Sequence, residues 1–132
     1  MILSGLYNRK IKSFDGCTLN CYTNFEGAYN QNKPLFVLSN GLICKYAWWY
    51  YLLPFLHDKC AQFVIYEYRG HFDGDYQNQK DNICLRVFGK DMAAMVAFFK
   101  ARQVVCIGHS MGVNVALEYA NNYQIYGDNQ NQ

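Results

Sequence analysis

The 132-residue sequence contains no apolar run that approaches the roughly 20 residues a membrane-spanning helix needs. Its first apolar stretch, Met1–Leu6, is too short for a signal peptide because Arg9 and Lys10 follow it. Charge is also sparse: 12 Lys and Arg stand against 10 Asp and Glu, and the basic residues form no stripe that could follow a phosphate backbone. These absences predict a cytoplasmic protein that neither spans a membrane nor binds nucleic acid.

The cysteines give no sign of a disulfide framework or a metal site. They lie in apolar, strand-like or helix-like surroundings, and 52% of all residues are apolar, which is enough to build a core without cross-links. Cys17 and Cys21 lack a second pair at zinc-ligand spacing, so we expect no metal, and nothing indicates a cofactor. The sequence predicts buried or half-buried free thiols at Cys17, Cys21, Cys44, Cys60, Cys84 and Cys106.

Hydrophobic periodicity predicts strands that alternate with helices. The short alternating segments Lys10–Phe14 and Thr18–Thr23 flank Asp15-Gly16, a dipeptide that tolerates the positive φ angles of a hairpin turn. Continuous apolar runs then predict strands covered on both faces, and segments with helical spacing predict helices between them. The strands are Leu35–Leu38, Phe63–Tyr66 and Val104–Ile107, and the helices are Tyr46–His57, Asp81–Lys100 and Val113–Tyr123.

This order of elements predicts the α/β class. Strands separated by single helices form βαβ units with right-handed crossovers, hence a mostly parallel sheet with helices on both faces. The amino-terminal hairpin adds an antiparallel portion to that sheet. Pro54 is expected to kink or shift the first helix.

The pentapeptide Gly108-His109-Ser110-Met111-Gly112 lies between a predicted strand and a predicted helix. A G-x-S-x-G turn in this position is typical of a nucleophile elbow, in which a β-carbon at either glycine would collide with backbone and the serine is held strained and exposed. The following helix directs the positive end of its dipole toward negative charge that develops on a substrate oxygen. A chance glycine–serine turn is the alternative, but the strand and the helix together favour Ser110 as a nucleophile.

From about Ile11 to Tyr123 the chain resembles the α/β-hydrolase family, in its serine esterase and lipase branch. Ser39-Asn40-Gly41-Leu42 looks like the oxyanion loop of that family, with Asn40 in place of the usual histidine. The resemblance implies an oxyanion hole formed by the backbone N–H groups of Leu42 and Met111. Because the donors are backbone groups, the replacement at Asn40 changes the hydrogen bonds that support the loop rather than the donors themselves.

A second matching segment follows the strand at Phe63–Tyr66. Glu67-Tyr68-Arg69-Gly70-His71 looks like the Asp-x-Arg-Gly-x-Gly segment of the family, with Glu67 in place of Asp and Phe72 in place of a glycine. The resemblance implies scaffold roles for Arg69 and Asp91, because a planar guanidinium suits fixed pairs with carboxylates. Substrate binding by Arg69 is the less favoured alternative.

A third matching segment corresponds to the first helix of the family. Its tryptophans, together with Tyr46, could line an apolar pocket near Leu42, although an aromatic stripe at helical spacing is more often core. The matching residues are Trp48, Trp49, Leu52, Leu53 and Leu56.

No histidine follows Ser110, whereas the family order is serine, then acid, then histidine. The carboxylates beyond Ser110 are Glu118 and Asp128, and neither follows a further predicted strand. Among the histidines before Ser110, we expect His109 to be packed, because adjacent side chains around such a turn point apart, and His57 to lie at the surface. His71, at a strand end, is the alternative that could enter the site.

The resemblance therefore implies a partial α/β-hydrolase domain at residues 1–126, ending after the elbow helix, with a polar Asn and Gln tail at residues 127–132. It implies a serine hydrolase for a carboxylic ester or related acyl substrate. Cofactor-free C–C bond cleavage and dehalogenation are weaker alternatives. Dehalogenation is further disfavoured because relatives with that chemistry use Asp at the elbow. The alternative is an inactive truncated product or an edge-pairing module, since strand 104–107 would be bare and uncharged. That edge would pair with a second copy or receive a missing carboxy-terminal half.

Overall fold

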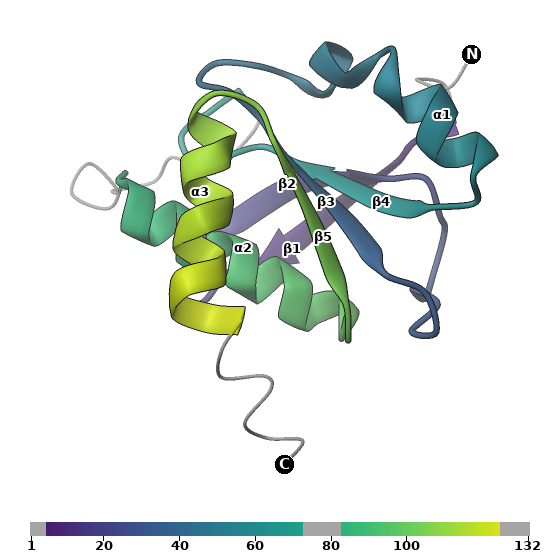
Figure 1. Ribbon diagram of the computed structural model, residues 1–132. Coiled ribbons are helices and arrows are strands. Elements are labelled where there is room, and N and C mark those ends of the chain that lie inside the picture. Colours follow the sequence, from purple (N-terminus) through teal and green to yellow (C-terminus); the bar gives the residue numbers. More distant parts are fainter. Residues whose placement is uncertain (1–4, 73–82, 125–132) are drawn as a thin grey trace.

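The protein contains a five-stranded sheet with the strand order β1-β2-β4-β3-β5 and helices packed against it (Figure 1). The computed structural model describes residues 5–72 and 83–124, so the predicted tail at 127–132 lies outside the described residues. The predicted α/β class is confirmed.

The hairpin consists of β1 (Tyr7–Lys12) and β2 (Thr18–Thr23), which pair antiparallel. The first strand begins and ends earlier than the predicted Lys10–Phe14. The reason is the turn: Gly16 N–H donates to the Ser13 carbonyl (3.1 Å), and Ser13 N–H donates to the Cys17 carbonyl (2.8 Å). These bonds close a three-residue loop in which Gly16 takes the positive φ of 85°.

The parallel part of the sheet contains β3 (Leu35–Ser39), β4 (Gln62–Tyr66) and β5 (Val104–Gly108). Strand β3 lies between β4 and β5 and pairs parallel with both, while β2 joins β4 antiparallel. The three apolar runs are therefore strands as predicted, and the sheet is mixed because the hairpin enters it antiparallel. The carboxyl ends of the three parallel strands meet at one edge of the sheet, where ligands bind in open α/β folds.

The predicted helix Tyr46–His57 is wrong as a single element. A 3₁₀ helix, η2 (Tyr46–Trp49), is followed by a turn and then by α1 (Leu52–Asp58). Pro54 lies in the first turn of α1, where backbone N–H groups have no partner within a helix, so the proline neither kinks nor breaks it.

The remaining helices are α2 (Leu85–Phe99), α3 (Met111–Tyr119) and the π-helical turn η4 (Ala120–Gln124). Residues 81 and 82 of the predicted Asp81–Lys100 helix lie outside the described residues, and Lys100 ends α2 with a φ of 54°. The last helix begins two residues before the predicted Val113 and changes its winding at Ala120. Among residues 5–72 and 83–124, no helix has the length and apolarity to cross a membrane.

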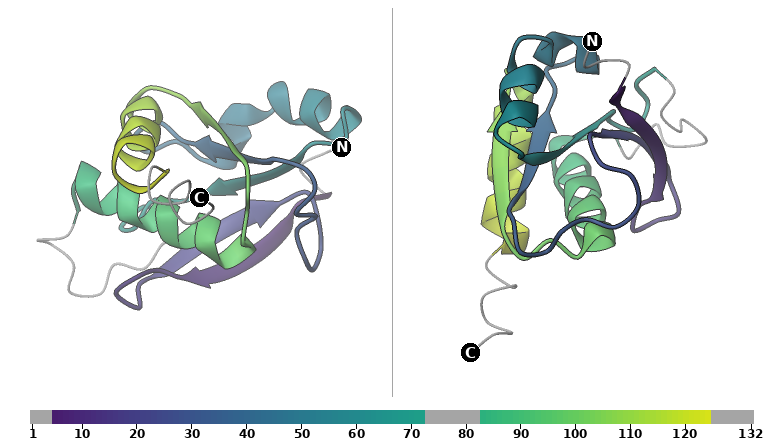
Figure 2. Two further views of the ribbon diagram at one scale, coloured as in Figure 1. Left: turned by 60° about the horizontal axis from the view of Figure 1, so that its bottom comes forward. Right: turned by 90° about the vertical axis from the view of Figure 1, so that its right-hand side faces the viewer.

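Two apolar clusters occupy the two faces of the sheet. Alternation along β4 separates them: Val64 and Tyr66 pack with α2 and α3, whereas Phe63 and Ile65 pack with α1. In the left view of Figure 2, α2 and α3 lie side by side and α1 lies apart from them. Helices therefore cover both faces of the sheet, as predicted, and bury the apolar side chains of the parallel strands on both faces.

The thiol prediction is partly wrong. None of the described cysteines forms a disulfide; Cys17 and Cys21 are buried and Cys44 and Cys106 half-buried, but Cys60 and Cys84 are exposed. Both exposed residues lie at helix ends, Cys60 after α1 and Cys84 just before α2, where the local apolar pattern does not determine burial. In contrast, burial raises the pKa of the Cys21 thiol to about 12. Within the described ranges no cluster of metal-ligating side chains is found.

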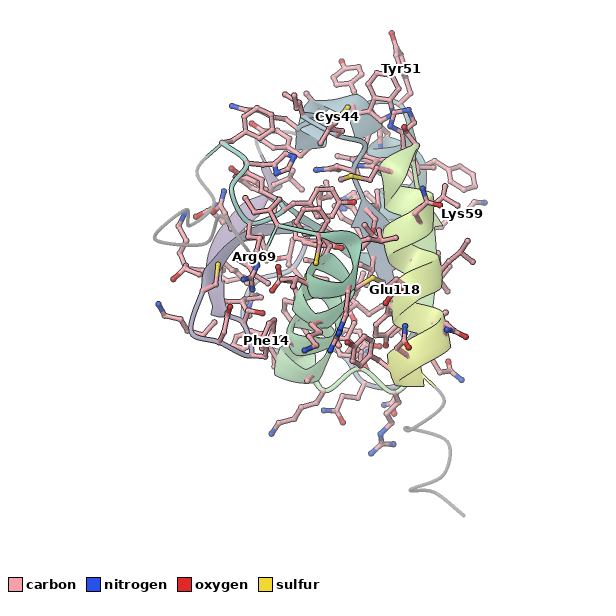
Figure 3. The ribbon with its side chains drawn as sticks, turned by 90° about the vertical axis from the view of Figure 1, so that its left-hand side faces the viewer. Phe14, Cys44, Tyr51, Lys59, Arg69 and Glu118 are labelled. Carbon is pink, nitrogen blue, oxygen red and sulfur yellow. The ribbon has the colours of Figure 1, made fainter. Side chains whose placement is uncertain are left out.

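A buried arginine connects the hairpin, the end of β4 and α2. Arg69 donates to both Asp91 oxygens (2.6 and 2.8 Å) and to both Asp15 oxygens (2.8 and 3.1 Å), and its side chain is fully buried. Burial lowers the pKa of Arg69, but the hydrogen bonds that Arg69 donates to Asp91 and Asp15 outweigh it and raise this pKa above its ordinary value. Figure 3 shows Arg69 inside the molecule, above Phe14 of the hairpin loop. Arg69 therefore has the scaffold role that was expected.

Candidate active site

Ser110 lies in the turn between β5 and α3, at the carboxyl edge of the parallel strands. It precedes the first residue of α3 and has φ 54° and ψ −120°, a backbone conformation that a non-glycine residue adopts only under strain. The serine is exposed. A short strand, a strained turn and a helix thus present the hydroxyl outward, with the amino-terminal end of α3 behind it.

The two glycines of the turn are required by space rather than by dihedral angle. A β-carbon at Gly108 would lie 2.6 Å from the Val113 nitrogen, and one at Gly112 would lie 1.9 Å from the Ser39 carbonyl oxygen. Both contacts are with backbone, which cannot move aside. Only glycine therefore lets α3 start this close to the end of β3.

The loop after β3 (residues 40–45, here the β3 loop) is held by hydrogen bonds to Asn40. Trp49 Nε1 donates to Asn40 Oδ1 (2.6 Å), Asn40 Nδ2 donates to the Tyr66 carbonyl (3.3 Å), and the Tyr68 hydroxyl donates to the Asn40 carbonyl (2.6 Å). Asn40 is almost completely buried. The asparagine that stands in place of the usual family histidine thus makes two bonds through its side chain and one through its carbonyl, and together they fix the start of the loop. The Tyr68 contact was not foreseen, because nothing in the sequence spacing links the two residues.

The structure brings the β3 loop and the elbow (residues 108–112) together. The backbone N–H of His109 donates to the Ser39 carbonyl (3.1 Å), and a β-carbon at Gly41 would lie 2.7 Å from His109 Nδ1. In Figure 3, Cys44 of the same loop lies near the start of α3. The predicted residues Asn40, Gly41 and Ser110 therefore belong to one region.

The two backbone donors predicted for the oxyanion hole are both without a partner. Across the described ranges, neither Leu42 N–H nor Met111 N–H donates to another group. Met111 is the first residue of α3, where a helix leaves its N–H groups unpaired, and Leu42 is in an exposed turn of the β3 loop. Unpaired donors at an accessible site are free to bind an anion or an oxyanion.

The structure places none of the three histidines as a partner of the serine hydroxyl; within the described chain no hydrogen bond joins them to Ser110. His109 is stacked on Trp48, with ring centroids 4.2 Å apart, and its Nδ1 is buried without a partner. His57 is exposed on α1. His71 packs edge-on against Tyr68 at 5.6 Å, and its Nδ1 lies 3.3 Å from the Arg69 carbonyl.

The aromatic residues of η2 divide between core and surface. Trp49 is buried in the cluster beneath α1, whereas Trp48 is 56% exposed beside the elbow. Sequence reasoning weighed these two tryptophans together, but a 3₁₀ helix turns them in different directions. The stacking of Trp48 on His109 was missed, because no sequence pattern connects residues so far apart.

Two departures from the family pattern have visible structural counterparts. Phe72 has a φ of 46°, a left-handed conformation that explains why a glycine is usual there, and its exposed ring receives Lys45 Nζ at 4.5 Å. Glu67 is buried, and its Oε2 has no partner in the described residues.

A cleft of about 340 Å³ lies at the opposite end of the strands, away from the elbow. It is lined by residues that include Asn24, Lys33, His57 and Cys60.

These features define a class: an open α/β sheet with a serine on a strained strand–turn–helix elbow at the carboxyl ends of parallel strands. The family model described as the alpha/beta hydrolase fold matches residues 34–129. The chain belongs to this family. No curated protein matches the sequence.

Solved structures of the same fold come from plants and bacteria. An epoxide hydrolase from Vigna radiata superposes with a TM-score of 0.79 at 15% identity, covering 92% of this chain and 36% of that protein. An epoxide hydrolase from an endophytic Streptomyces gives 0.76 at 19% identity, with 91% and 34% covered. A proposed aryl esterase from Burkholderia cenocepacia gives 0.73 at 21% identity, with 89% and 42% covered. The chain thus spans about two fifths or less of the length of these proteins.

Proposed function

We propose that this chain carries the nucleophile and the oxyanion hole of a serine hydrolase that acts on a carboxylic ester or a related acyl substrate. The observation that carries the proposal is an exposed Ser110 at positive φ, followed directly by Met111. Among the described residues neither Met111 N–H nor Leu42 N–H has a partner, and Leu42 belongs to the loop that contacts the elbow through His109. Family membership supports hydrolysis as the reaction type. The esterase among the similar structures is compatible with an ester substrate, although its likeness extends to the fold alone.

In this mechanism Ser110 Oγ attacks the carbonyl carbon and its proton passes to a general base. The carbonyl oxygen becomes an oxyanion, which the N–H groups of Leu42 and Met111 bind, assisted by the amino-terminal end of α3. Breakdown of the tetrahedral intermediate expels the alcohol, which takes the proton from the base, and water then hydrolyses the acyl-serine.

The 132 residues do not contain a histidine after Ser110, where the family has its general base. The preceding neighbour of Ser110, His109, is stacked on Trp48. We therefore expect the acid and the histidine to come from residues beyond this chain. The similar structures are more than twice as long, which is compatible with that source.

The test is covalent labelling of the natural gene product by a fluorophosphonate, followed by mass spectrometry of the labelled peptide. The label is expected on the peptide that contains Ser110, and Ser110→Ala should abolish it. Heat-unfolded protein is the matched control, because labelling requires the folded elbow. Equal labelling of the Ser110→Ala variant would overturn the assignment. Rapid ester hydrolysis by the 132-residue chain alone, abolished by Ser110→Ala, would overturn the expectation that the base lies elsewhere, since losing a triad member leaves only about 10³- to 10⁴-fold catalysis over water.

A second candidate function is binding through the edge of β5. Within the described residues β5 pairs with β3 only, and Val104–Gly108 carries no charge. An uncharged edge strand accepts another strand, either from a second copy of this chain or from the remaining part of a hydrolase fold. Light scattering separates the cases: a dimer supports pairing between copies, whereas a cooperative monomer contradicts it.

A further inference from the structure

We propose that His109 is a positioning residue that fixes the β3 loop by the shape of its ring and not by transferring a proton. This inference rests on the proposed function, because it assigns the residue that places the Leu42 donor of the oxyanion hole. The packing around Gly41 supports this role.

The His109 ring lies within a group of three aromatic rings. One face stacks on Trp48 with centroids 4.2 Å apart and planes inclined by 30°, and Trp49 approaches edge-on at 6.5 Å and 87°. Trp49 in turn donates its Nε1–H to Asn40 in the β3 loop. The imidazole is therefore held by η2 on one side and touches a loop that η2 also holds.

The ring occupies the space in which a side chain at Gly41 would lie. A β-carbon there would be 2.7 Å from His109 Nδ1, 3.1 Å from its Cε1 and 3.3 Å from Cys44 Sγ. Gly41 does not have a positive φ, so its φ angle does not require glycine. The histidine, and not the dihedral angle, thus determines that position 41 is glycine.

The backbone of His109 leaves its ring little freedom to move away. Its N–H donates to the Ser39 carbonyl (3.1 Å), and its carbonyl accepts from Gly112 N–H (2.9 Å). The first bond attaches residue 109 to the end of β3, directly before the β3 loop. The His109 backbone therefore holds the loop at Ser39, and the His109 ring holds it at Gly41. Leu42 is the residue directly after Gly41.

The chemistry of the ring nitrogen separates a positioning role from a catalytic one. His109 Nδ1 is buried and no described group bonds to it. A buried polar atom that lacks a partner costs free energy, so this nitrogen is not what holds the ring in place. What the ring supplies at this point is volume and stacking, which phenylalanine also supplies.

The experiment compares His109→Ala, which removes the ring, with His109→Phe, which keeps its shape and removes both nitrogens. Fluorophosphonate labelling of Ser110 should slow by about 10- to 100-fold in His109→Ala, as expected when an oxyanion donor is misplaced, and stay within about threefold of the parent in His109→Phe. Unchanged labelling in His109→Ala overturns the proposal. Equal slowing in both variants also overturns it, because the nitrogens would then matter.

Amide hydrogen exchange decides the question even where Ser110 is not labelled, an outcome that counts against the proposed function alone. Exchange at the Cys44 amide, whose N–H donates to the Gly41 carbonyl (3.2 Å), should rise in His109→Ala and stay at the parent rate in His109→Phe. Unchanged exchange in His109→Ala overturns the positioning role without reference to any reaction.

A size swap tests the contact directly. Gly41→Ala alone should lower the Tm, because the new methyl group meets the imidazole, and adding His109→Ala should raise the Tm again by removing the clash. The matched control combines Gly41→Ala with Phe98→Ala, since Phe98 is exposed on α2, and its effects should simply add. Additive losses in the swapped pair would contradict the contact.

Discussion

The two edges of the sheet are chemically different. Strand β1 carries lysines at its edge, with Lys10 Nζ bonded to Asn20 Oδ1 and Lys12 Nζ bonded to Thr18 Oγ1 (2.7 and 2.6 Å). Strand β5 carries Val, Cys and Ile, and no charge, along its full length. Lysines on an edge strand discourage pairing with another chain, and β5 lacks this protection. The β1 edge is therefore built as an end of the sheet, whereas the β5 edge is suited to accept a neighbour.

The interior beneath the two edges differs in the same sense. The hairpin side is fastened by side chains, through the bonds of Arg69 to Asp15 and Asp91. The β5 side is fastened by close backbone contact, because Gly112 lets α3 lie against the end of β3. Substitutions on the hairpin side should therefore lower the stability by breaking ion pairs, and those on the β5 side by creating steric clashes with the backbone.

The largest effect is expected on the hairpin side from Arg69→Met. This variant leaves Asp91 fully buried with only the Ser13 hydroxyl as a described partner, and breaking such a buried pair costs about 3–5 kcal/mol. Urea denaturation measures the loss. The double variant Arg69→Met with Asp91→Leu should recover part of it, and a single variant as stable as the parent would contradict the anchoring role.

On the β5 side, Gly112→Ala should destabilise by about 1–3 kcal/mol, because its β-carbon meets the Ser39 carbonyl. The same substitution at Gly5, where no atom lies within 4 Å, is the matched control and should leave the stability nearly unchanged. Thermal unfolding of both variants tests the difference. Equal Tm values would mean that the backbone contact is not tight.

The ion pair between Arg69 and Asp15 should also make the stability of the protein depend on pH. The hydrogen bond from Arg69 lowers the pKa of Asp15 below its ordinary value of 3.8. Because the folded pKa lies below the unfolded one, the stabilisation is complete above 3.8 and is lost as the pH falls through the folded pKa.

Asp15→Asn keeps an oxygen for the Cys17 N–H and removes the charge. The parent should exceed this variant by about 1 kcal/mol near neutral pH, and the difference should shrink in acid. Urea curves at a series of pH values measure it. A difference that does not depend on pH would contradict the ion pair as its source.

The smallest effect on folding, and the most direct test of the edges, comes from exchanging their character. Val105→Lys and Lys12→Val should each change the stability by less than about 0.5 kcal/mol, because both side chains reach solvent. Association should change in opposite directions, with Val105→Lys more monomeric and Lys12→Val less so. Light scattering of the two variants beside the parent tests this, and identical association of all three would remove the contrast between the edges.

The sequence was sufficient where one local rule dominates. The apolar runs predicted all three parallel strands, and the spacing of Phe88, Met92 and Phe99 predicted α2, since each depends on one face meeting the core. The elbow could be located because glycine is needed for a tight backbone approach, which Gly108 and Gly112 both show.

The sequence was insufficient where contacts distant along the chain decide the outcome. The pattern of Tyr46–Tyr51 predicts an α-helix, but Tyr46–Trp49 forms a 3₁₀ helix. In this conformation Trp49 bonds to Asn40 and Trp48 stacks on His109. The exposed Cys60 follows from a turn with φ 56° that apolar neighbours do not reveal. The packing of His109 was foreseen, but its contact with Gly41 requires the fold.

The buried charge network also sets an order of events during synthesis. Ser13 and Asp91 are bonded across 78 residues of sequence. At about 5–20 residues per second, roughly 4–16 s pass between the appearance of the hairpin and that of its helical anchor. For that interval β1 and β2 exist without the bonds that later fasten them. A ribosome-bound chain stalled before α2 should therefore be readily cleaved by protease in the hairpin, and one stalled after α2 has emerged should be protected.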